Sequence, residues 1–282
     1  MSKKVENLLE IKDLKVCFQT ENGLVQALRN VSFEVRLGEV LALVGESGCG
    51  KSVTALSVMG LLPQPEGIIS GGSIHFQGRD LVRLPRKELR KYTGNEISMI
   101  FQEPMTSLNP VYTVGYQICE AIRQHSRISK KAVHDHTIEM LDKVGIAEAG
   151  KRFDAYPHQL SGGMRQRVMI AMALSCNPRL LIADEPTTAL DVTIQAQILE
   201  LMLELNQSIG MSMIMITHDL GVVAEIAERV AVMYAGRIVE TSQVVPLFTN
   251  PSHPYTWGLL GSMPWVDREQ ERLSPIAGIV PN

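Results

Sequence analysis

The sequence predicts an α/β fold built around a mostly parallel sheet. Short aliphatic runs end at polar residues, as strands that are buried on both faces of a parallel sheet do. Segments with helical spacing separate these runs and give the alternation of strand and helix that α/β proteins show. Hydrophobic residues make up 45% of the 282-residue chain and aromatic residues only 5%, which suits an aliphatic core.

The predicted elements follow one another along the chain. Two extended runs, residues 9–18 and 27–35, meet at the break Glu21-Asn22-Gly23 and predict an antiparallel flap beside the main sheet. Residues 103–160 contain no good buried strand but carry helical spacing over 114–125 and 130–144, so we expect a helical insertion there. The other expected strands are 40–44, 97–101, 180–183 and 211–217, and the other expected helices are 52–62, 164–174, 193–209 and 220–229.

Charge and cysteine usage exclude several classes of protein. The 27 basic and 30 acidic residues give a net charge of −3, so no overall basic field draws the chain to nucleic acid. Cys17, Cys49, Cys119 and Cys176 lie far apart without a CxxC pair, which argues against a zinc site and a disulfide framework and favours a reducing, cytosolic compartment. The sequence has no signal-peptide pattern and no run that approaches the ~20 apolar residues of a membrane span.

A glycine-rich loop follows the first buried strand. Residues 45–52 read Gly-Glu-Ser-Gly-Cys-Gly-Lys-Ser and match GxxxxGK[ST] between a strand and a helix, the context of a phosphate-binding loop. Backbone N–H groups and the helix N-terminus favour phosphate, Lys51 is expected to reach the β and γ phosphates, and Ser52 to hold Mg²⁺. The alternative is a chance glycine-rich turn. The candidate binding residues are Gly45, Glu46, Ser47, Gly48, Cys49, Gly50, Lys51, Ser52 and Val53.

Two carboxylates end the strand 180–183. Asp184 and Glu185 repel each other and lose solvation at a buried strand end unless a cation or an exchangeable proton offsets the cost. Mg²⁺ supplies that offset, so we expect Asp184 on the metal side and Glu185 orienting or deprotonating the attacking water. The alternative is a pair of helix-capping acids.

Two further strands end at single polar residues, Gln102 and His218. Ligands collect outside the carboxyl ends of parallel strands, so Lys51, the two acids, Gln102 and His218 are expected to converge on one γ-phosphate. Gln102 is also a candidate Mg²⁺ ligand. Taken alone, His218 is a candidate helix cap and Gln102 a candidate loop residue.

A second anion site is predicted at the start of the helix 164–174. Ser161, Gly162 and Gly163 expose backbone N–H groups at this helix start, although an ordinary serine cap explains them as well. The chain thus has two candidate phosphate-binding helix starts but only one glycine-rich loop with a lysine. A dimer in which Ser161 and Gly163 of one chain lie over the nucleotide of the other accounts for both.

The motifs together resemble those of the ATP-binding-cassette ATPases, over nearly the whole chain. Their order is the glycine-rich loop, Gln102, LSGGMRQ at 160–166, LLIADE at 180–185, Thr188-Ala-Leu-Asp191 and His218. The resemblance implies a P-loop nucleotide hydrolase (RecA-like) core with an N-terminal antiparallel β subdomain and an inserted helical subdomain. It also implies a head-to-tail dimer that sandwiches two ATP molecules, with Asp191 in the dimer contact. Phe18 falls where the family stacks an aromatic ring on adenine, although a core strand residue is an alternative.

On this resemblance the chain is a single ATPase domain, 1–282. Residues 1–102 and 177–245 would form the catalytic core with its β flap, and residues 103–176 the helical and signature subdomain. Residues 246–282 would form a C-terminal appendage, and we expect it to be truncated because the sequence stops at Val280-Pro281-Asn282.

Two segments, residues 99–118 and 250–264, resemble the ATPase subunits of bacterial dipeptide, oligopeptide and nickel importers. The implied function is ATP hydrolysis that drives a peptide importer, with a nickel importer as the alternative. The implied partners are two integral-membrane permease subunits, a second ATPase subunit of the same or a related kind and, indirectly, an extracellular solute-binding protein, with no nucleic acid. The implied location is peripheral, on the cytoplasmic face of the inner membrane. The importer subunits continue into a cysteine-containing tail that holds an iron–sulfur cluster, and none is expected in these 282 residues.

Two rival functions are disfavoured. A soluble cassette ATPase that acts on DNA or ribosomes separates its motifs by a long coiled coil or carries two cassettes, whereas Lys51 and Ser161 are only 110 residues apart here and one cassette is present. A nucleotide-binding subunit without turnover does not need Glu185.

Overall fold

The computed structural model describes residues 6–21, 23–102, 107–187 and 191–262. The chain divides into two compact units, which are described separately. The first unit comprises residues 1–84 and 214–282, and the second comprises residues 85–213. Within the described residues, no helix combines the length and the apolar character needed to cross a bilayer.

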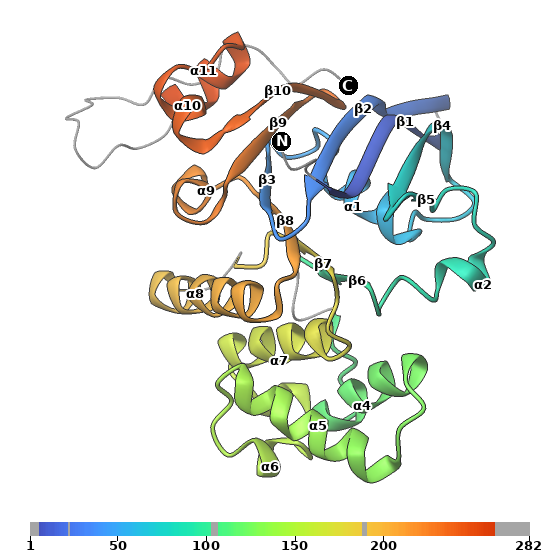
Figure 1. Ribbon diagram of the computed structural model, residues 1–282, viewed down its shortest axis with the longest axis vertical. Helices are drawn as coiled ribbons and strands as arrows, with labels where there is room; N and C mark the ends of the chain where they lie inside the picture. The colour runs from blue at the N-terminus through green and yellow to red at the C-terminus, as the bar shows by residue number, and fades with distance from the viewer. Residues whose placement is uncertain (1–5, 22, 103–106, 188–190, 263–282) are drawn as a thin grey trace. The chain divides into compact units, whose positions relative to one another are not determined.

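An antiparallel sheet begins the first unit (Figure 1). Its strand order is β2-β1-β4-β5. The two long strands β1 and β2 form a hairpin in which Thr20 pairs with Gly23 and Cys17 with Gln26, which confirms the predicted flap. The two strands that complete the sheet were not predicted. The strands are β1 (Asn7–Thr20), β2 (Gly23–Arg36), β4 (Gly67–Phe76) and β5 (Arg79–Asp80).

The other strands of this unit follow the order β10-β9-β3-β8. The five residues of β3 are all buried, and this strand runs parallel to β9, with Leu41 opposite Arg229. An apolar cluster that includes Val44, Val232 and Leu260 joins these strands to the helices beside them. The strands are β3 (Val40–Val44), β8 (Ser212–Thr217, which starts in the second unit), β9 (Arg229–Tyr234) and β10 (Arg237–Gln243). The helices are α1 (Lys51–Met59), α9 (Leu220–Ile226), α10 (Val244–Thr249) and α11 (Pro254–Gly261).

One predicted helix is wrong over its last residues. The helix expected over 220–229 ends at Ile226, and Arg229 already begins β9. Arg229 pairs with β3 and the fully buried residues 230–232 continue this pairing, so sheet pairing overrides the expected helix here. The other predicted elements match the structure or differ from it by up to four residues at an end, for example where Gly60 caps α1 in a left-handed conformation.

The second unit joins a parallel strand pair to a group of helices. Strands β6 and β7 pair from Ile97 opposite Leu180 to Ile100 opposite Ala183. Helices α4 and α5 begin after the caps Thr113 and Ser129, whose side chains accept backbone N–H groups of the first turn. The elements are α2 (Arg86–Leu89), β6 (Ile97–Ile100), α4 (Val114–His125), α5 (Lys130–Lys143), α6 (Ala149–Arg152), a 3₁₀ turn (Pro157–Gln159), α7 (Gly162–Leu174), β7 (Leu180–Asp184) and α8 (Val192–Ile209).

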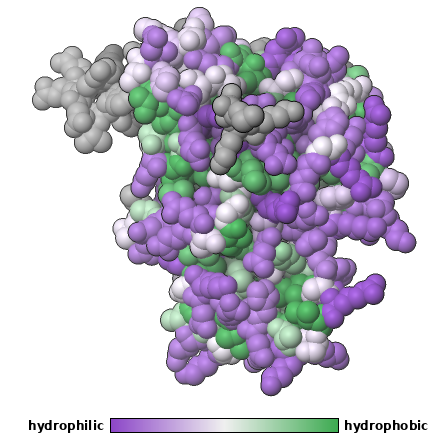
Figure 2. All heavy atoms as spheres, viewed as in Figure 1, coloured by the Kyte–Doolittle hydropathy of each residue, from purple (hydrophilic) through white to green (hydrophobic). Residues whose placement is uncertain are grey.

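The helical part of this unit confirms the helical spacing read from the sequence. Helix α4 packs against α5 and α7, and residues such as Val114, Ile118 and Val133 are fully buried. On the visible face of α4–α7, hydrophilic residues alternate with smaller hydrophobic areas (Figure 2). The predicted boundaries of the helical subdomain, at 103 and 176, remain predictions.

Candidate functional site

The glycine-rich loop occupies the turn between β3 and α1 in the first unit. Gly45 and Gly50 have φ angles of 151° and 111°, which side chains rarely allow. A Cβ on Gly45 would collide with the Met233 carbonyl, and one on Gly50 would lie 2.7 Å from Cδ2 of Leu28. Glycine is therefore required at both positions by backbone conformation and by close packing.

Lys51 is folded back into this loop. Its Nζ donates hydrogen bonds to the carbonyl of Gly45 at 2.7 Å and to that of Glu46 at 2.8 Å, and the residue is only 5% exposed. A buried ammonium needs partners of this kind because desolvation of a charge is costly. The loop thus holds a positive charge close to its own backbone. Burial raises the pKa of the neighbouring Cys49 thiol, which leaves the thiol neutral.

The start of α1 has the features of an anion site. Its N-cap is Gly50, which offers no side chain to the first-turn N–H groups, and the first turn has no acidic residue. Thr54 donates its hydroxyl to the Gly50 carbonyl at 2.9 Å and fixes the junction of loop and helix. Ser52 and Val53 are partly exposed at this end. Helix N-terminal N–H groups without a cap favour phosphate and other anions.

In the second unit, polar residues at the ends of β6 and β7 meet. Gln102 follows β6, and its Nε2 donates to Oε2 of Glu185 at 2.9 Å. Asp184, the last residue of β7, is only 5% exposed. Glu185 has a φ of 46°, a conformation that non-glycine residues seldom adopt. The expectation that Gln102 comes close to the acids is met, because neighbouring parallel strands end at the same sheet edge.

His218 is exposed directly after β8, in the first unit. The cap of the next helix is Asp219, whose Oδ1 accepts the N–H groups of Gly221 at 2.9 Å and Val222 at 3.3 Å. The alternative in which His218 caps this helix is therefore wrong.

The serine–glycine segment begins α7. Ser161 is the N-cap of α7, and its hydroxyl accepts the N–H of Met164 at 3.3 Å. The serine cap is therefore present, and the anion site at the same helix start stays a prediction. A Cβ on Gly163 would lie 3.0 Å from Cγ2 of Ile194, which shows how closely α7 approaches α8.

Sequence reasoning gave no role to two residues that the structure connects to the candidate site. Gln166 is 1% exposed, and its Nε2 donates to the carbonyl of Pro186, the residue after Glu185. Tyr255 accepts the backbone N–H of Glu46 within the glycine-rich loop. Gln166 lies inside the LSGGMRQ motif, which was the available signal, and Tyr255 lies inside the segment 250–264, whose resemblance to importer subunits suggested no contact with the loop.

The roles of two other residues, Phe18 and Asp191, stay predictions. Phe18 is half-buried in β1, paired with Val25 on one side and Gly67 on the other. Asp191 is exposed and precedes α8 without a side-chain cap bond. Residues 188–190 of its motif, and the end of the 250–264 segment, lie outside the described residues.

Comparison with known proteins places these features in a family. The family model for ABC transporters matches residues 28–188, and that for the oligopeptide/dipeptide transporter C-terminal region matches residues 239–282. The oligopeptide transport ATP-binding protein OppD of Bacillus subtilis (strain 168) is 58% identical over 280 residues, which are 99% of this chain and 78% of that protein. The dipeptide transport ATP-binding protein DppD of Escherichia coli (strain K12) is 52% identical over 274 residues, 97% of this chain and 84% of that protein.

Two solved structures of ABC proteins are similar in fold to this chain. An ATP-binding cassette that was solved as a dimer in a post-hydrolysis state, bound to ADP and Pi, has a TM-score of 0.73 and 28% identity, and the match covers 84% of this chain and 98% of that one. CbiO1 from Clostridium perfringens, part of an ABC transporter complex, has a TM-score of 0.72 and 27% identity over 87% and 92% of the two chains. The predicted P-loop nucleotide hydrolase fold is thereby confirmed. The chain therefore belongs to the ABC transporter family, among its ATP-hydrolysing ATP-binding subunits.

Proposed function

We propose that this chain is the energy-coupling ATPase of an importer for dipeptides or oligopeptides. The match to the oligopeptide/dipeptide C-terminal region and the names of both relatives support the peptide class. The observation that carries the ATPase site is the loop closed around the Lys51 ammonium, at the uncapped start of α1.

Lys51 binds the β and γ phosphates of ATP in this proposal, and the first-turn N–H groups of α1 bind them beside it. Ammonium and backbone donors suit phosphate oxygens, and the charge of Lys51 is already held in the loop. The hydroxyl of Ser52, the carboxylate of Asp184 and the amide oxygen of Gln102 are the hard oxygen donors that fit Mg²⁺. When bound, Mg²⁺ neutralises charge that develops on the phosphates.

Glu185 orients and deprotonates the attacking water, and Gln102 positions it. The hydrogen bond between their side chains supports this division of roles, because it holds the carboxylate of Glu185 beside the amide of Gln102. His218 acts on the γ-phosphate from its exposed place after β8.

Two chains work together as a sandwich dimer. Ser161, Gly162 and Gly163 of one chain bind the ATP that lies on the glycine-rich loop of the other, and Asp191 contributes to the contact between chains. The start of α7 supports this role, since its first turn has no acidic residue that would repel a phosphate. The second chain is an identical or a related ATPase subunit.

The membrane partners are two permease subunits, which the helical part of the second unit contacts at the cytoplasmic face of the inner membrane. A pocket of about 320 Å³ beside α4 supports this contact. Its lining includes Tyr112, Gln117 and Met172, and the Tyr112 ring stacks on Tyr116 with 4.8 Å between centroids. Both tyrosines are more than 40% exposed, so they offer apolar surface to a permease segment.

Calorimetric titration of Lys51→Ala with ATP tests the site. Loss of charged hydrogen bonds to two phosphates should weaken ATP binding by about 10- to 100-fold and ADP binding by less. Lys12→Ala is the matched control, because Lys12 is exposed on β1 and pairs with Glu10 at 2.6 Å. An unchanged affinity for ATP in Lys51→Ala would remove the glycine-rich loop as the phosphate site.

A further inference from the structure

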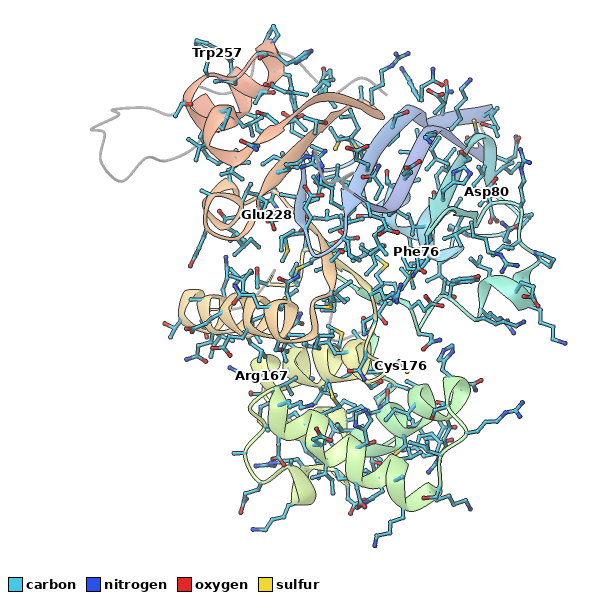
Figure 3. All side chains as sticks on the ribbon, in the orientation of Figure 1. Phe76, Asp80, Arg167, Cys176, Glu228 and Trp257 are labelled. Atoms are coloured by element: carbon cyan, nitrogen blue, oxygen red, sulfur yellow. The ribbon has the colours of Figure 1, made fainter. Side chains whose placement is uncertain are left out.

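The C-terminal segment of the first unit reaches the glycine-rich loop. Tyr255 lies in α11, and its hydroxyl oxygen accepts a hydrogen bond from the backbone N–H of Glu46 at 3.0 Å. The two residues are 209 positions apart in the sequence. Figure 3 labels Trp257, which is two residues further along the same helix. The loop thus has a contact from outside its own motif, supplied by the region that matches the peptide-transporter model.

This contact completes the anchoring of one short loop segment. The carbonyls of Gly45 and Glu46 both accept from Nζ of Lys51, and the Glu46 N–H is taken by Tyr255. The start of the loop is therefore held from two sides, by the lysine of the loop and by a tyrosine of α11.

Tyr255 is itself held firmly. Tyr255 is 7% exposed, and its ring packs on the ring of Tyr234 with 4.4 Å between the ring centroids. The ring of His253 accepts the Tyr255 N–H at 3.1 Å, and the carboxylate of Glu240 accepts the N–H groups of Ser252 at 2.8 Å and His253 at 3.0 Å. These bonds fix the start of α11 on β10. Burial raises the pKa of Tyr255 to about 12, so the hydroxyl that accepts the Glu46 N–H stays neutral near pH 7.

The two anchors of the loop respond differently to nucleotide. An ammonium has three N–H donors, and here two of them are used on carbonyls of the loop itself. Phosphate oxygens compete for the same donors, and they are stronger acceptors because they are charged. As Lys51 turns its donors toward phosphate, its hold on Gly45 and Glu46 weakens, whereas the bond from the Glu46 N–H to Tyr255 does not depend on the donors of Lys51.

We propose that Tyr255 is a positioning residue for the ATPase reaction, which keeps the start of the phosphate-binding loop in place while Lys51 engages ATP. This inference rests on the proposed role of the loop. It assigns a function in nucleotide binding to the C-terminal segment, and it makes the hydroxyl of Tyr255 more important with nucleotide bound than without.

The test compares Tyr255→Phe with Tyr234→Phe. Each variant removes one hydroxyl and keeps the packed pair of rings, so both are expected to fold and to melt within a few degrees of each other. For Tyr255→Phe, we expect calorimetric affinity for a non-hydrolysable ATP analogue to fall about 3- to 10-fold, the loss of one hydrogen bond, with KM for ATP raised similarly. Amide exchange at Glu46 should accelerate in this variant alone.

Equal analogue affinity in Tyr255→Phe, Tyr234→Phe and the unaltered protein would overturn the inference. So would a lower melting temperature of Tyr255→Phe without any change in affinity, because that result describes a purely structural contact. Lys51→Ala separates this failure from failure of the proposed site: if it abolishes tight ATP binding while Tyr255→Phe does not weaken it, the loop binds phosphate and only the role of Tyr255 is refuted.

Discussion

Substitution of Glu185 by glutamine isolates the chemistry of the proposed base. Glutamine has nearly the same volume, meets the same backbone requirement at a φ of 46°, and offers an amide oxygen to the Gln102 Nε2 that now donates at 2.9 Å. The variant loses the negative charge and the ability to take a proton. Nearly all of its effect should therefore appear in hydrolysis and little of it in folding or ATP binding.

The size of the effect follows from the role that is removed. General base catalysis contributes about 10²- to 10⁴-fold to a rate, which is about 3 to 5 kcal/mol of activation free energy. The hydrogen bond from Gln102 also changes from a charge-assisted to a neutral one, which is roughly half as strong. We expect Glu185→Gln to hydrolyse ATP at least ~100-fold more slowly and to bind ATP with an affinity within about threefold of the unaltered protein.

Phosphate release at saturating Mg-ATP measures the rate, and calorimetry measures ATP affinity. Because hydrolysis no longer separates the chains, size-exclusion chromatography with ATP and Mg²⁺ should show a dimer that accumulates. Glu200→Gln is the matched control, since Glu200 is an exposed carboxylate on α8. Hydrolysis within tenfold of the unaltered rate would refute the reasoning and move the role of base to another group, with His218 the next candidate.

Two further perturbations test the dimer contact and the core. Ser161→Asp and Ser161→Asn both keep a good helix cap for α7, but only the aspartate places a charge against the partner's γ-phosphate. We therefore expect Ser161→Asp to keep monomeric ATP affinity and lose most of its turnover relative to Ser161→Asn, and equal phosphate release by the two would contradict the sandwich arrangement. The serine position is preferable to Gly163, where any side chain would press on Ile194. Arg229→Leu leaves the 3% exposed carboxylate of Glu39 without the guanidinium that now lies 3.1 Å away. Urea denaturation should show about 3 kcal/mol lower unfolding free energy, partly restored by adding Glu39→Gln, whereas a loss below about 1 kcal/mol would mean that the pair is solvated.

Much of the architecture was visible in local patterns. The mostly apolar runs of β3, β6 and β7 predicted these strands, and helical spacing predicted α4 over its observed range, Val114–His125. Strand β4 was not predicted because it contains three glycines, which have low strand propensity, so its pairing with β1 decides its conformation. Strand β9 was not predicted because the expected helix 220–229 was extended into its first residue, whereas pairing with β3 makes residues 229–232 a strand.

Some features of the candidate site also follow from local sequence, whereas others depend on the tertiary structure. The glycine-rich loop and the start of α7 are determined by sequence alone, since contiguous residues set the backbone conformation and the helix start. The bond from Gln102 to Glu185 joins residues 83 positions apart, and it could be expected because adjacent parallel strands end together. The bond from Glu46 to Tyr255 had no such signal. It depends on where β10 and the cluster around Val44 place α11, and contacts between distant segments are set by packing of the whole core rather than by any local pattern.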